Sequence, residues 1–169
     1  DGALAIAWLR DHATSLGFDT DRLFLLGHSA GAHLAALTAT DPRYLEKEGG
    51  SREWITAVAG LAGPYAFTPE DRDMKAIFGP PERYAQMQVP TFVDGQQPPM
   101  LLLHGGEDGL VSPENQEKLA ATIRKKGGEV IEKIYPDLHH ISIIGSLSWF
   151  YRNDQPVADD VDRFFRQYF

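Results

Sequence analysis

Cysteine is absent from the 169 residues of this chain. Its absence excludes a disulfide framework, a thiolate metal site and a cysteine nucleophile, while it leaves the cellular compartment open, with the cytoplasm favoured. Long hydrophobic runs are also missing, since no apolar stretch approaches the roughly 20 residues that cross a bilayer. The first residues show no signal-peptide pattern. The sequence therefore predicts no membrane span.

An excess of basic residues is missing as well. The chain has 16 Lys and Arg against 24 Asp and Glu, which gives a net charge of −8, and both signs are mixed along the sequence. This balance argues against a nucleic-acid surface and against a patch that binds anionic membranes. The HExxH pattern is absent, and no His and Asp residues cluster at the spacing of metal ligands. We therefore expect no nucleic-acid partner, no metal and no cofactor.

What the sequence does contain is a regular alternation of apolar runs and helical patterns. Its length and its 43% apolar content fit one globular domain, residues 1–169. Buried strands are expected at residues 22–27, 55–63, 100–105 and 129–135, the last nearer an edge because it is more mixed. Helices are expected at residues 4–16, 30–39, 113–126 and 141–151, and from Pro156 onward. Ser112 is expected to be the N-cap of the third of these helices, with Pro113 at its first position. This order predicts an α/β fold in which about four parallel strands carry helices on both faces.

A serine lies between two glycines where the first expected strand becomes a helix, in the stretch LFLLGHSAGAHLAALTA, residues 23–39. In a Gly-x-Ser-x-Gly nucleophile elbow the serine has a strained backbone, and small flanking residues let strand and helix pack closely. The helix N-terminus adds partial positive charge beside the hydroxyl. Because serine is a poor nucleophile at neutral pH, this interpretation requires a base and an acid farther along the chain.

Candidates for both partners follow later strands in the order serine, acid, histidine that this architecture requires. Glu107 and Asp108 come directly after the third expected strand, and His139 and His140 come directly after the fourth. Glu107 is expected to be a solvated loop charge, which favours Asp108, but chain order alone leaves the acid open between these two residues. It also leaves the base open between His139 and His140. The sequence therefore predicts a serine hydrolase.

The chain resembles serine esterases of the α/β-hydrolase superfamily in the segments DRLFLLGHSAGAHLAAL, AGPY, PPMLLLHGGEDGLVSPENQEKLA and YPDLHHISII. The resemblance is to the carboxylesterase and lipase type, near enzymes related to hormone-sensitive lipase and kynurenine formamidase. It implies that Ser29 is the nucleophile, Asp108 the acid and His140 the base. It also implies that the backbone N–H of Ala30 is one arm of the oxyanion hole. The implied reaction is hydrolysis of a small-molecule carboxylic ester through an acyl-enzyme, and an aryl formamidase acting on N-formylkynurenine is the alternative.

One feature of the resembling enzymes is missing from this sequence. They carry a His-Gly-Gly loop upstream of the serine that supplies further oxyanion donors, and the 28 residues before Ser29 contain no such motif. The triplet at residues 104–106 has the same letters, but it ends the acid-bearing strand and belongs to the acid turn. We therefore expect the C-terminal part of a larger hydrolase, or a chain completed by a partner or by a second copy of itself. The alternative outside enzymes that act alone is a non-catalytic module with a hydrolase-like fold, or a partial hydrolase that needs a missing segment or partner.

Two further residues are candidates for contact with a substrate. His28, inside the elbow, is interpreted as a packed or substrate-facing residue rather than a catalyst. Tyr65 follows the second expected strand and could wall an acyl pocket, although core packing fits it equally well. Tyr65 lies near the start of the region 64–99, which is rich in proline, glycine and charged residues. This region predicts a long loop with one or two short helices.

Overall fold

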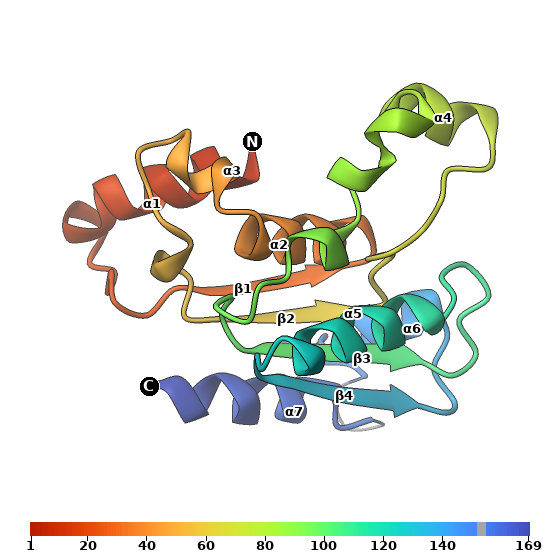
Figure 1. Ribbon diagram of the computed structural model, residues 1–169. Coiled ribbons are helices and arrows are strands. Elements are labelled where there is room, and N and C mark those ends of the chain that lie inside the picture. The colour runs from red at the N-terminus through yellow and green to blue at the C-terminus, as the bar shows by residue number, and fades with distance from the viewer. Residues whose placement is uncertain (152–154) are drawn as a thin grey trace.

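The computed structural model describes residues 1–151 and 155–169 (Figure 1). The described strands are β1 (Phe24–His28), β2 (Ala57–Leu61), β3 (Met100–Gly105) and β4 (Val130–Tyr135). The α-helices are α1 (Gly2–Leu16), α2 (Ala30–Thr40), α3 (Arg43–Glu46), α4 (Arg72–Phe78), α5 (Glu114–Lys125), α6 (His140–Gly145) and α7 (Val157–Phe165). Short 3-10 helices are η1 (Arg52–Trp54), η2 (Pro81–Gln86), η3 (Val89–Phe92) and η4 (Arg166–Tyr168).

The four strands form one parallel sheet in the order β1-β2-β3-β4. Every residue of β2 and β3 is buried, whereas β1 and β4 lie at the two edges of this sheet. Since all strands run the same way, their carboxyl ends lie together at one end of the sheet (Figure 1). In open parallel sheets this is the end where functional sites are found.

Apolar side chains cover both faces of the sheet and hold the helices against it. On one face Val58, Met100 and Leu102 pack with residues from α1, α2 and α5. On the other face Leu101 and Leu103 pack with residues from α6 and α7. Figure 1 shows α1 and α2 on one side of the sheet and α7 on the opposite side. Burial of these two apolar layers supplies the main favourable free energy of the fold.

The sequence correctly predicts four parallel strands with helices on both faces, and β4 at an edge. The strand expected at 22–27 is not buried: β1 is the other edge strand of this sheet, and Leu26 is exposed. Two helices differ most from the prediction. The helix expected at 141–151 begins at His140 and ends at Gly145, where glycine has a low helix propensity. Ser112 is not the N-cap of α5: that position is Pro113, and the Ser112 hydroxyl accepts a hydrogen bond from the N–H of Glu114 at 3.3 Å.

The long connection between β2 and β3 contains α4 together with η2 and η3. Figure 1 shows α4 projecting beyond the sheet on the side where the strands end. Within the described ranges, none of the helices combines the length and the apolar character that crossing a bilayer requires.

Candidate active site

Ser29 lies at the junction between β1 and α2 with a strained backbone, φ 55° and ψ −122°. A positive φ is uncommon for a residue other than glycine. The N–H of Ser29 donates to the carbonyl of Leu61 at 2.8 Å, which extends the pairing of β1 with β2 to the serine itself. The backbone therefore fixes where the Ser29 hydroxyl lies.

The two glycines of the elbow differ in what surrounds them. A Cβ on Gly27 would lie 2.3 Å from the carbonyl oxygen of Gly31, so the close approach of α2 to β1 requires glycine at position 27. A Cβ on Gly31 would meet no atom within 4 Å. The expectation that both flanking positions must be small is therefore right for Gly27 and wrong for Gly31.

Three residues that each follow a different strand meet at the carboxyl end of the sheet. The Nε2 of His140 lies 2.9 Å from the Oγ of Ser29, and the Nδ1 of His140 lies 2.8 Å from an oxygen of Asp108. Because an ionised carboxylate can only accept, Nδ1 carries the hydrogen and Nε2 is free to accept from the serine hydroxyl. The arrangement can therefore remove the hydroxyl proton of Ser29.

The carboxylate of Asp108 is shielded from solvent, and both of its oxygens accept hydrogen bonds. One oxygen accepts the backbone N–H groups of Leu110 and Val111, both at 2.9 Å, and the other accepts from His140. Burial by itself would raise the pKa of Asp108, but these hydrogen bonds outweigh it and hold the pKa below its usual value. Asp108 is therefore ionised at neutral pH and able to stabilise a positive charge on His140.

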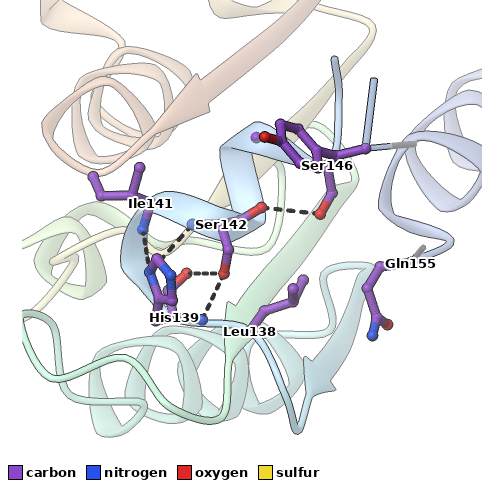
Figure 2. Close-up of a pocket in the computed structure, with 8 residues that line it drawn as sticks. Leu138, His139, Ile141, Ser142, Ser146 and Gln155 are labelled. Carbon is purple, nitrogen blue, oxygen red and sulfur yellow. Dashed lines mark hydrogen bonds between the residues drawn. The ribbon is translucent and has the colours of Figure 1, made fainter. Parts of the chain in front are cut away.

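His139 and His140 have different surroundings although they are adjacent. His140 is 7% exposed and is the first residue of α6. His139 is exposed and caps α6: its Nδ1 accepts the N–H groups of Ile141 and Ser142, both at 3.3 Å, as Figure 2 shows. Of the two candidate bases, only His140 contacts both Ser29 and Asp108. Glu107, the alternative acid, is exposed.

Glycines in the acid turn let it approach the loop that carries the base. A Cβ on Gly105 would lie 2.3 Å from the carbonyl oxygen of Leu138, and one on Gly106 would lie 2.7 Å from that of Pro136. The N–H of Glu107 donates to the carbonyl of Leu138 at 2.9 Å. The Gly105-Gly106 pair therefore belongs to the acid turn, as the sequence predicts.

The remaining predicted residues have mixed outcomes. Ala30 is the first residue of α2, and the N–H groups of a first helical turn have no acceptor within their own helix. Tyr65 is 1% exposed and packs over Gly60 and Gly63, so of its two interpretations the structure favours core packing over a wall of the acyl pocket. His28 is partly buried, and its Nε2 lies 2.8 Å from the carbonyl oxygen of His140.

Sequence reasoning missed His104, which it treated only as part of a Gly-rich turn. This histidine is fully buried, and its Nε2 lies 3.6 Å from the carboxylate of Asp108. A histidine at the end of an apolar strand, four residues before the acid, was the available signal. Among the described residues, no group of three or more His, Asp or Glu side chains is arranged to hold a metal ion.

A small cavity of about 270 Å³ lies on the outer side of α6 (Figure 2). Its lining comprises Leu138, His139, Ile141, Ser142, Gly145, Ser146, Tyr151 and Gln155. The flanking residues of the base thus face this cavity, while His140 itself turns inward toward Ser29.

Solved structures share this fold. The acetyl ester-xyloside bifunctional hydrolase from Caldicellulosiruptor lactoaceticus matches with a TM-score of 0.79 at 23% identity, over 98% of this chain and 64% of that one. Esterase 2 of Thermogutta terrifontis, phosphonylated by sarin, matches with a TM-score of 0.80 at 22% identity, over 98% and 64%. With its four parallel strands and its strand–serine–helix turn, the chain has part of an α/β-hydrolase fold.

Curated relatives are similar in sequence as well. Esterase LipC of Mycobacterium tuberculosis is 32% identical over 150 residues, which cover 76% of this chain and 37% of LipC. The probable isoprenylcysteine alpha-carbonyl methylesterase ICMEL1 of Arabidopsis thaliana is 27% identical over 167 residues, covering 85% and 35%. The chain thus spans about a third of the length of these relatives. The sequence model of the BD-FAE family matches residues 1–123, and the chain belongs to this family.

Proposed function

We propose that this chain carries the catalytic residues of a serine hydrolase that cleaves carboxylic esters through an acyl-enzyme. The relay from Ser29 through His140 to Asp108, with separations of 2.9 and 2.8 Å, is the observation that carries the proposal. The names of the relatives, which include an esterase and a probable methylesterase, support the same bond type.

In the first half of the reaction, the Oγ of Ser29 attacks the ester carbonyl carbon while its proton passes to the Nε2 of His140. The tetrahedral intermediate then collapses, the bond to the alcohol breaks, and His140 gives the same proton to the leaving alkoxide. In the second half, His140 takes a proton from water, which attacks the acyl group. Loss of the acid returns the proton to Ser29.

Asp108 and the start of α2 stabilise the charges that develop. Asp108 holds His140 with its hydrogen on Nδ1 and offsets the positive charge of the imidazolium. The N–H of Ala30 can donate to the oxyanion, and one such donor contributes about 10²- to 10³-fold in rate. The macrodipole of α2 favours negative charge at the same place.

Hydrolysis of p-nitrophenyl acetate and butyrate, followed with a stopped-flow instrument, tests this function. We expect a burst of p-nitrophenol that titrates Ser29, followed by slower turnover as the acyl-enzyme is hydrolysed. The variant S29A should fold as the wild type does and show neither phase. Turnover by S29A at the wild-type rate would contradict the proposal, and preferential cleavage of N-formylkynurenine would favour the formamidase alternative.

A further inference from the structure

Two histidines outside the proposed triad lie at the same end of the sheet. His28 is the last residue of β1, and its ring centroid lies 4.7 Å from that of His140. His104 is the next-to-last residue of β3 and is fully buried. Neither side chain is used by the proposed reaction, and each contacts a segment that carries one of the reacting side chains.

The contact of each histidine defines where its proton lies. The Nε2 of His28 is 2.8 Å from the carbonyl oxygen of His140, and the Nε2 of His104 is 3.0 Å from the carbonyl oxygen of Val111. A carbonyl oxygen can only accept, so Nε2 carries the hydrogen in both rings. His140 has the opposite tautomer, because its Nδ1 faces a carboxylate.

The contacts of His104 close a ring around the acid. Its Nε2–H donates to the carbonyl of Val111, whose own N–H donates to one oxygen of Asp108. The same Nε2 lies 3.6 Å from the other oxygen of Asp108. His104 therefore braces the turn that aims the carboxylate at His140.

Both rings are suited to stay neutral. Among the described residues, the Nδ1 of His104 is buried with no hydrogen-bond partner, so a second proton there would be an unpaired donor in the interior. The titratable groups that face each ring are Asp108 and His140. A charged ring beside Asp108 would compete with the imidazolium of His140 for its negative charge. Burial is the main cause that lowers the pKa of both His28 and His104.

We propose that His28 and His104 are positioning residues, which hold the base and the acid in place as neutral rings with the hydrogen on Nε2. The proposal rests on the proposed function for its catalytic consequence, but not for its geometry. His28 fixes the backbone of His140 against the strand that presents Ser29. His104 fixes the turn that presents Asp108.

Nuclear magnetic resonance of the ¹⁵N-histidine-labelled chain tests the geometry without any substrate. We expect His28 and His104 to be neutral Nε2–H tautomers at pH 7, and the Nδ1–H of His140 to give a downfield proton signal from its bond to Asp108. A protonated ring or an Nδ1–H tautomer at His28 or His104 would overturn the proposal.

Paired substitutions test the consequence. In H104Q and H28Q the side-chain amide nitrogen occupies roughly the place of Nε2. In H104N and H28N the side chain is too short for its amide nitrogen to reach the carbonyl of Val111 or His140. We expect the Asn variants to lose the downfield signal and about 10-fold in kcat on p-nitrophenyl acetate, with KM unchanged, as the loss of a hydrogen bond of about 1.4 kcal/mol implies. The Gln variants should retain the signal and stay within about threefold of the wild type.

His33 provides a matched control, because its Nε2 also lies within hydrogen-bond distance of a backbone carbonyl, that of Met87, at 2.7 Å. The segment that contains Met87 carries neither the acid nor the base. H33N should keep the downfield signal. Folded Asn variants of His28 and His104 that keep both signal and kcat would overturn the proposal; if they fail to fold, the tautomers of the wild type and the Gln variants decide. A wild type with the expected tautomers but no ester turnover would contradict the proposed function alone.

Discussion

On the β1 side of the candidate site the backbone fixes Ser29, whereas on the β3 and β4 side hydrogen bonds fix Asp108 and His140. Ser29 has a positive φ and sits where Gly27 lets α2 contact the strand. Asp108 is held by the N–H groups of two turn residues and by His140. The position of Ser29 should therefore be sensitive to side-chain volume in the elbow. The positions of Asp108 and His140 should be sensitive to protonation and to loss of hydrogen bonds.

The largest expected effect separates the two adjacent histidines of the acid–base side. H140A removes the base and should lower kcat/KM on p-nitrophenyl esters by about 10⁴-fold or more. H139A removes only an exposed cap of α6 and should retain most of the activity. Steady-state kinetics of both variants check this, and equal losses or the reverse ranking would show that the wrong histidine was assigned.

A second pair of variants tests the acid. D108N should lower kcat by about 10³- to 10⁴-fold, because an amide does not hold the imidazole with its hydrogen on Nδ1. E107Q changes an exposed side chain beside it and should have little effect. The two are compared under one set of assay conditions. An active D108N together with an inactive E107Q would exchange the roles of these residues.

On the nucleophile side, the two elbow glycines should respond in opposite directions. G27A places a methyl group 2.3 Å from a backbone oxygen and should lower the free energy of unfolding by about 1–3 kcal/mol. G31A meets open space in a helix and should raise it by up to about 1 kcal/mol. Urea denaturation measures both, and equal destabilisation would contradict the packing described for α2.

The smallest expected effect is the acid sensitivity of stability. Burial lowers the pKa of His28, His33 and His104 in the folded state, so the unfolded chain binds more protons below about pH 6.5, the usual histidine value. The free energy of unfolding should therefore fall as the pH drops through this range. The lowered pKa of Asp108 adds a further loss below about pH 4, its usual range. In H104Q the decline near pH 6 should be shallower, and urea titrations from pH 5 to 8 measure it.

Local patterns predicted the fold well where a residue's surroundings are set by its own neighbours. Continuous apolar runs indicated β2 and β3, and chain order together with strand ends indicated Ser29, one acid of the pair 107–108 and one histidine of the pair 139–140. The preference for His140 over His139 came from the family resemblance, since both histidines follow the same strand.

The features that sequence could not give depend on contacts between distant segments. Tyr65 packs into the core because glycines at 60 and 63 leave room for its ring, and no local sequence pattern indicates this contact. His104 contacts Asp108 only because the turn after β3 folds back on the strand end. The helix that begins at His140 ends at Gly145, where glycine has a low helix propensity, and a single glycine inside an apolar run is only a weak sequence signal of a helix end.

Reaction of the chain with a fluorophosphonate probe tests the central claim most directly, because this probe requires an activated serine. The account predicts covalent labelling at Ser29, located by peptide mass spectrometry, that is lost in S29A and strongly slowed in H140A at neutral pH. Labelling that is absent from the folded wild type, or that occurs at another serine, would contradict it.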